Sequence, residues 1–102
     1  MPGVGKLLKQ AQKMQKAMEA VQAELETLSV EGSAAGGAVK ATVNGQGTLK
    51  AVKIDPEFLK EDAESVEASI VAAVADAVEK AKAQSTEQMN KVTGGFNIPG
   101  LF

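Results

Sequence analysis

The sequence predicts an α+β fold in which two long terminal helices flank a three-stranded antiparallel meander, in the order α-β-β-β-α. Two patterns support this prediction. Apolar residues recur every three or four positions towards both ends of the chain, which is the period of a helix that buries one face. Between these segments, apolar and polar residues alternate and glycines interrupt them, as in short strands joined by turns. The 102 residues correspond to a single domain, which we place at residues 1–95.

The first helix is expected from Leu7 to Leu28. No glycine or proline lies between Lys6 and Glu31, and most residues there are good helix formers. The apolar positions advance in alternating steps of four and three residues, which is typical of a helix that packs along a second helix. These positions are Leu7, Ala11, Met14, Met18, Val21, Leu25 and Leu28. The preceding residues, Pro2–Gly5, are expected to form a flexible leader.

Three strands are expected after this helix. A short first strand is placed near Ser29–Gly32, before a glycine-rich loop. Val39–Val43 alternates apolar with polar residues and predicts the second strand. Gly45 and Gly47 are expected to supply the positive φ angles of a tight hairpin turn. Leu49–Ile54 then predicts a third strand, antiparallel to the second, which ends before a proline.

The second helix is expected to begin after Asp62, its predicted N-cap residue, and to continue to about Val92. Its apolar stripe has helical spacing, and Val71 and Val78 are expected to widen it. The stripe consists of Val66, Ile70, Val74, Ala77 and Ala81. Residues 96–102 are apolar but contain Pro and Gly, so we expect a flexible C-terminal tail.

Charge is distributed unevenly along the chain. The net charge is −2, yet residues 1–18 contain four lysines and no acid, and residues 80–102 contain three lysines and one acid. The first helix enters the sheet by its C-terminus and the second leaves it by its N-terminus, so both basic ends are expected to point away from the sheet in the same direction. Solvated helix faces are the alternative to phosphate binding. The candidate DNA-binding residues are Lys6, Lys9, Lys13, Lys16, Lys80, Lys82 and Lys91.

The residue types that are missing restrict the chemistry. The chain has no Cys, His, Trp or Tyr, which removes disulfides, thiol nucleophiles, Cys/His zinc sites and a His general base. The segment Pro2–Lys6 is similar to the end of a nucleotide-binding P-loop, but Leu7 stands where a Ser or Thr would hold magnesium. The acids between Asp55 and Glu67 are expected to cap and solvate a helix start. We therefore expect no enzyme activity, no metal, no cofactor and no small-molecule substrate.

The chain is expected to be cytoplasmic. No apolar run approaches the ~20 residues that a membrane span requires. No apolar segment with a cleavage site indicates a signal peptide at the N-terminus.

Several segments together resemble the YbaB/EbfC family of nucleoid-associated proteins. They are Lys9–Gln15, Val39–Gly45, Ile54–Pro56, Ile70–Ala73 and the Gly/Pro-containing tail, in this order along the whole chain. The resemblance implies a homodimer whose sheets join and whose helices project as tweezer-like arms around double-stranded DNA, with little sequence preference. The dimerisation residues expected on this basis are Val39, Ala41, Val43, Leu49, Val52 and Ile54.

The resulting hypothesis is a nucleoid-associated protein that contacts duplex DNA through lysines on its arms and contributes to nucleoid organisation, with gene regulation as a further open role. The chain has lysines but no arginine, so phosphate contacts with low sequence specificity are expected. The alternative is a prefoldin-like chaperone or protein-interaction clamp that holds its partner through apolar helix tips. RNA also remains an open partner.

Overall fold

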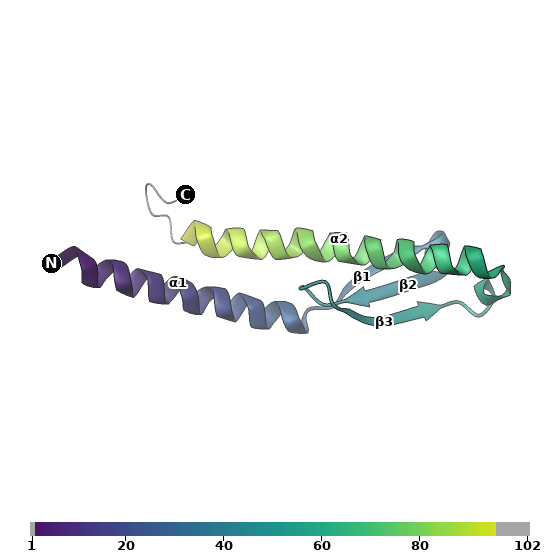
Figure 1. Ribbon diagram of the computed structural model, residues 1–102, viewed down its shortest axis with the longest axis horizontal. Coiled ribbons are helices and arrows are strands. Elements are labelled where there is room, and N and C mark those ends of the chain that lie inside the picture. Colours follow the sequence, from purple (N-terminus) through teal and green to yellow (C-terminus); the bar gives the residue numbers. More distant parts are fainter. Residues whose placement is uncertain (1, 96–102) are drawn as a thin grey trace.

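The computed structural model describes residues 2–95 and shows an elongated molecule, with Cα extents of 71 × 22 × 16 Å (Figure 1). Its radius of gyration is 19.6 Å, well above the ~13 Å of a compact chain of this length. The predicted α-β-β-β-α order is confirmed. The elements are α1 (Pro2–Thr27), β1 (Val30–Ala34), η1 (Ala35–Gly37), β2 (Val39–Val43), β3 (Leu49–Ile54), η2 (Phe58–Lys60) and α2 (Ala63–Gly95). The predicted tail lies outside the described residues.

The three strands form an antiparallel sheet in the order β1-β2-β3. The predicted bounds of β2 and β3 are confirmed, because alternation marks β2 and because the glycine-containing turn and Pro56 delimit β3. Ala41 lies opposite Val52, and a bulge leaves Lys50 without a cross-strand partner between the pairs Thr42–Ala51 and Val43–Leu49. β1 reaches further along the chain than predicted, since Ser33 and Ala34 pair with β2 instead of starting a loop.

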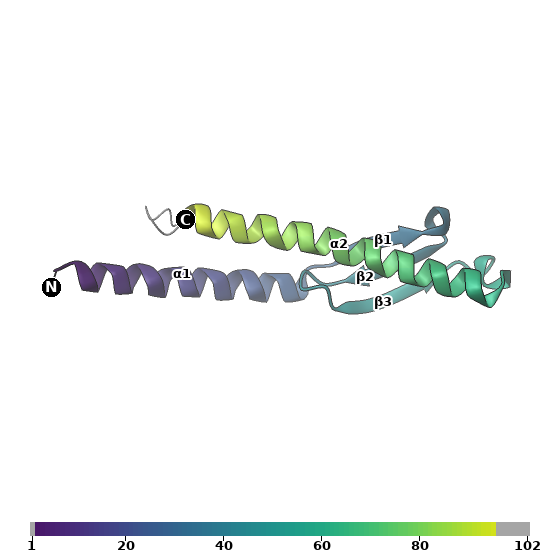
Figure 2. The same ribbon diagram turned by 45° about the horizontal axis from the view of Figure 1, so that its top comes forward.

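The first half of α2 covers β1 and β2 (Figure 2). The buried core joins strand residues such as Val39 and Val43 to a row of three alanines on the helix, Ala73, Ala77 and Ala81. The prediction for this helix was wrong in two respects. The buried row includes Ala73, which was not part of the predicted stripe. Val71 is 68% exposed and Val78 is 37% exposed, so they do not widen the buried face.

The close approach of helix and sheet explains why small residues are selected here. A Cβ atom built on Gly32 would overlap the backbone of Ala77 and lie 2.5 Å from the carbonyl oxygen of Ala73. A glycine on the strand and alanines on the helix therefore allow the two backbones to meet. The position of α2 above the sheet depends on Gly32, Ala73 and Ala77.

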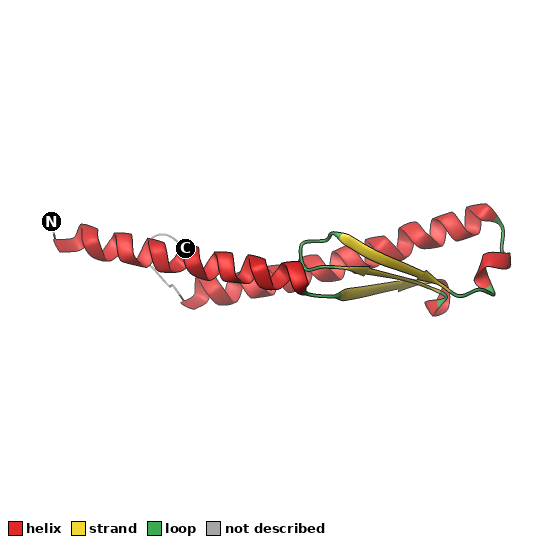
Figure 3. Cartoon of the chain, turned by 90° about the horizontal axis from the view of Figure 1, so that it is seen from below, coloured by secondary structure: helices red, strands yellow, loops and turns green. Residues whose placement is uncertain are grey.

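The path of α2 along the sheet was not predicted from the sequence. α2 begins beyond the far end of the sheet, after η2, and crosses the whole sheet before it reaches α1 (Figure 1). α1 and the sheet lie end to end (Figure 3). We use the term arm for α1 together with residues 83–95 of α2. The expected outcome for the termini still holds, because the N-terminus of α1 and the C-terminal end of α2 lie at the same end of the molecule.

The β2–β3 hairpin anchors the arm to the sheet. The Gly45 N–H donates a hydrogen bond to the Leu25 carbonyl (2.7 Å), and a Cβ atom on Gly45 would lie 2.6 Å from Leu25 Cδ2. The buried Asn44 side chain accepts hydrogen bonds from the backbone N–H groups of Gln46 and Thr48. Only Gly47 has the predicted positive φ, 85°. Glycine is needed at position 45 for a different reason, because the α1 backbone at Leu25 lies too close for a side chain.

The starts of the two helices complete the fold. α1 begins at Pro2, so the predicted flexible leader is helical. Proline is favoured in the first turn of a helix, because a backbone N–H at this position has no hydrogen-bond acceptor within the helix. Asp62 lies just before α2, as predicted for an N-cap, and its carboxylate accepts a hydrogen bond from the Ser65 hydroxyl (2.5 Å). This hydrogen bond holds the pKa of Asp62 below its usual range.

Candidate nucleic-acid interface

Four lysines form one exposed face on α1. Lys6, Lys9, Lys13 and Lys16 follow one another at steps of three, four and three residues, which places them on the same side of a helix. All four are exposed. None forms an ion pair with a residue between positions 2 and 95. We call this surface the lysine face.

The lysine face lies beside the contact between the two helices. Val21 and Leu25 are buried on the inner side of α1, and Met14 and Met18 are half-buried there. Because each residue turns an α-helix by about 100°, Lys13 projects roughly a quarter of a turn away from this inner side. The ammonium groups therefore project into solvent along the outer half of the arm. The positive end of the α1 dipole lies at the same end of the helix.

The lysines of α2 do not join this face. Lys80 Nζ lies 3.0 Å from the Asp76 carboxylate, so its charge is already paired beside the sheet. Lys82 and Lys91 are nine residues apart, which places them on opposite sides of the helix. Lys82 borders a small hollow of about 240 Å³ beside the hairpin, with Gln46 and Thr86. The structure thus brings four of the seven predicted lysines together and separates the other three.

One polar residue beside the lysine face was missed in the sequence analysis. Gln12 lies three residues after Lys9 and four residues before Lys16, and it is exposed. A Gln amide donates hydrogen bonds to phosphate oxygens in many protein–DNA complexes. The same three-and-four spacing that groups the lysines identifies Gln12, but a search for charge alone passes over it.

The predicted dimerisation residues divide into two groups. Val39, Ala41 and Val43 are fully buried within one chain, beneath α2. Fully covered side chains have no area to offer to a second chain. On β3, by contrast, Leu49 is 48% exposed and Val52 is 38% exposed, while Ile54 is half-buried.

Residues 2–95 contain neither a metal-binding cluster nor a membrane-spanning helix. No group of three or more acidic side chains in this part of the chain is placed to hold a metal ion. No helix within the same residues is both long and apolar enough to cross a bilayer.

The same fold occurs in a solved structure of an uncharacterized protein from Helicobacter pylori. The match has a TM-score of 0.73 and 22% sequence identity, and it covers 89% of this chain and 94% of the other. At this level of identity the similarity shows the fold alone.

Relatives with similar sequences are more closely related to this chain than the solved structure is. A nucleoid-associated protein of Caldanaerobacter subterraneus subsp. tengcongensis is 44% identical over 100 residues, which cover 97% of this chain and 90% of the relative. A nucleoid-associated protein of Gluconacetobacter diazotrophicus is 46% identical over 100 residues, with coverage of 97% and 94%. Fold and relatives together define a class of small bacterial nucleoid-associated proteins. The model of the YbaB/EbfC DNA-binding family matches residues 1–96, and the chain belongs to this family.

Proposed function

We propose that this protein binds the double-stranded DNA of the bacterial nucleoid, in the cytoplasm, through the lysine face of its arm. The observation that supports this proposal is the set of four exposed lysines on one side of α1, without ion pairs to the described residues. Membership of a DNA-binding family gives the partner its chemical identity. The proposed role is the organisation of the nucleoid, with effects on transcription as a consequence.

Electrostatics drives the proposed binding. Each ammonium group that approaches a phosphate releases condensed counterions from the duplex. Lys16 lies near the middle of α1 and Lys6 near its start, so the lysine face extends over ten positions, or about 15 Å of helix axis. A lysine is a point charge without the planar fork with which arginine reads guanine. The chain contains no arginine, so the contacts position the protein on the backbone without selecting a sequence.

Low specificity is tested by competition between two duplexes of equal length and unrelated sequence. We expect the two to compete for the purified protein with nearly equal affinity. A sequence-specific protein prefers its site by ~10³-fold or more over other DNA. A preference of that size for either duplex would contradict the proposed mode of binding.

We further propose that two chains form a dimer through their β3 strands. The other edge of the sheet is protected, because the Ser33 N–H on β1 donates a hydrogen bond to the Asp76 carboxylate (3.0 Å). This hydrogen bond, followed by that from Lys80, holds the pKa of Asp76 below its usual range. The carboxylate therefore stays ionised and covers the β1 edge until the pH falls through that lowered pKa.

The β3 edge has no such cover among the described residues. Val52 lies opposite Ala41 and therefore on the face of the sheet that α2 packs against. α2 packs on β1 and β2, and it leaves Leu49 and Val52 partly exposed. An open strand edge beside exposed apolar side chains is a template for pairing with another strand. A second copy of β3 would extend the sheet and cover these residues.

The dimer is tested with the double variant Leu49→Glu/Val52→Glu. Two carboxylates at the edge would lose their hydration if a second strand approached, so we expect the variant to be monomeric by sedimentation equilibrium and the wild type to be dimeric. Leu59→Glu is the matched control, because Leu59 is 57% exposed and lies on η2, away from this edge. A dimeric double variant with an unchanged circular dichroism spectrum would exclude the β3 interface.

A further inference from the structure

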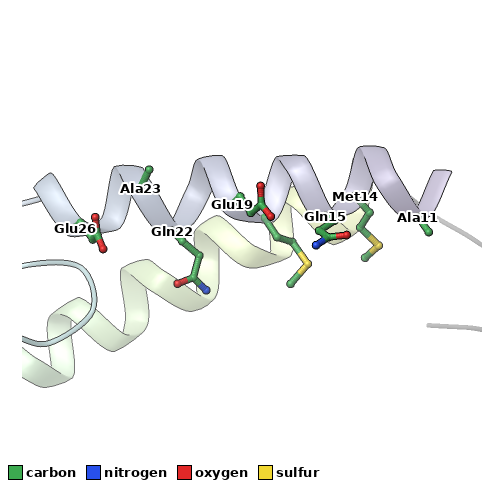
Figure 4. A pocket seen from close by; sticks show the side chains of 8 residues that line it. Ala11, Met14, Gln15, Glu19, Gln22, Ala23 and Glu26 are labelled. Atoms are coloured by element: carbon green, nitrogen blue, oxygen red, sulfur yellow. The ribbon is translucent and has the colours of Figure 1, made fainter. Parts of the chain in front are cut away.

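A second face of α1, beside the one that meets α2, is left largely uncovered by the described residues. A groove of about 710 Å³ runs along it, and all eight residues that line it belong to α1 (Figure 4). Met14, Gln15 and Gln22 project from the same side of the helix, whereas Ala23 projects from the other. The lining of the groove extends from Ala11 to Glu26, in the part of α1 nearer the sheet.

The spacing of the residues explains the groove. The covered residues on the inner side of α1, which meets α2, follow steps of three and four residues and are Met14, Ala17, Val21, Leu25 and, directly after the helix, Leu28. A second series, with alternating steps of four and three residues, is Val4, Leu8, Ala11, Gln15, Met18 and Gln22. Such a series marks the contact line of a coiled coil. A helix with two adjoining series of this kind has sides for two neighbouring helices, and α2 occupies one of them.

The exposure of the second series shows that it is uncovered. Val4 and Leu8 are each 60% exposed. Ala11, Gln15 and Gln22 are also exposed, and Met18 is half-buried. Four of the six positions are apolar, and Gln occupies the other two. This composition suits a helix contact that forms and separates more readily than a fully apolar core.

Charge indicates which helix fits the groove. Within α1, residues 2–18 contain four lysines and no acid, whereas residues 19–27 contain three glutamates and no base. A second copy of α1 in antiparallel orientation brings the glutamates of each helix to the first turns of the other. Lys6 and the positive end of the helix dipole lie there. A parallel copy would instead place lysines beside lysines.

We propose that α1 of a second copy fills this groove in antiparallel orientation, so that the arms of separate molecules pair. The midpoint of the second series sets the register, in which Val4 lies opposite Gln22, Leu8 opposite Met18 and Ala11 opposite Gln15. The lysine face remains free, because Lys9 and Lys13 are each two residues, or about 200° of helix rotation, from Ala11. Paired arms therefore present lysines on their outer surfaces, where they connect two stretches of duplex.

The arrangement is tested by disulfide crosslinking, since the chain contains no cysteine of its own. Val4→Cys and Gln22→Cys are prepared as two separate variants and mixed without DNA under mild oxidation. A disulfide requires Cβ atoms within about 4.5 Å of each other. We expect a crosslinked product in the mixture that is several-fold more abundant than in either variant alone.

The matched control is a mixture of Lys6→Cys and Ala20→Cys. These positions have the same sum as 4 and 22 and therefore lie at the same height in the antiparallel pair, but they are on the lysine side of α1. We expect little crosslinking there. Equal yields for the two mixtures, or a Val4→Cys variant that crosslinks to itself as efficiently as to Gln22→Cys, would overturn the proposal. The crosslinking yield depends neither on DNA binding nor on the β3 interface. The proposed pairing of arms can therefore be wrong even if the proposals for DNA binding and for the β3 dimer are correct.

Discussion

Reversing two charges on the lysine face, in the variant Lys9→Glu/Lys13→Glu, is expected to weaken binding to duplex DNA by about 100-fold or more at low salt. Half of the proposed phosphate contacts on each arm are lost, and each new carboxylate repels the phosphates. Both positions are exposed and are not part of the contact with α2, so the fold should persist. The measurement is an equilibrium titration of a labelled random-sequence duplex with each protein.

The control for this experiment is Lys40→Glu/Lys60→Glu, which changes the net charge by the same amount. Lys40 lies on β2 and Lys60 on η2, at the opposite end of the molecule, and both are exposed. Their ion pairs with Glu31 and Glu57 are exposed as well and contribute little to stability. If the two double variants lose affinity equally, net charge and not the lysine face controls binding. A clamp that acts through apolar helix tips would be insensitive to both.

Gly32→Ala is expected to cause the largest loss of stability of any single methyl group added to the chain. The new Cβ atom would overlap the backbone of Ala77, so α2 must move away from β1. Forcing extra volume into a packed contact costs 1–3 kcal/mol in typical cores, and here a backbone stands in the way. We expect a loss of about 3 kcal/mol or more, a large part of the stability of a small domain, in urea unfolding.

Gly5→Ala is the matched control, because the same methyl group is added in open space on α1. Alanine is a better helix former than glycine by roughly 1 kcal/mol, so this variant should be as stable as the wild type or more stable. If Gly32→Ala unfolds at the same urea concentration as the wild type, the close contact between strand and helix is not a determinant of the fold.

Local patterns in the sequence sufficed to predict the elements themselves. The alternation in Val39–Val43 marked β2 correctly, because one face of this strand lies in the core. The turn before Leu49 and Pro56 after Ile54 marked the ends of β3. The helical period marked α1 and α2. These patterns report on a residue's own element, and so they predict its type and its bounds well.

Contacts between distant elements were harder to predict. The need for glycine at positions 32 and 45 arises from backbones that meet across the fold, with Ala77 and with Leu25, and no local pattern indicates this. Periodicity also favoured valines over Ala73 as core residues of α2. A close helix–sheet contact selects small side chains instead, so hydrophobicity alone was misleading.

The candidate site also combines features that local patterns predict with features that depend on distant contacts. The lysine face follows from spacing within one helix, and the sequence contains all the information needed to find it. The pairing of Lys80 with Asp76 depends on the position of β1, whose Ser33 binds the same carboxylate from 43 residues away. Likewise, alternation shows which side of β3 faces α2, but not that α2 stops short of Val52.

The central claim is that the lysine face holds duplex DNA by displacing counterions, and the affinity of the wild-type protein for a random-sequence duplex across a salt series tests it most directly. Each phosphate contact contributes about −0.9 to the slope of log affinity against log salt. We expect a slope of about −4 if one lysine face of four residues engages the duplex, and about −7 if both arms of a dimer engage it. A slope near zero, or no binding even at the lowest salt, would contradict the claim.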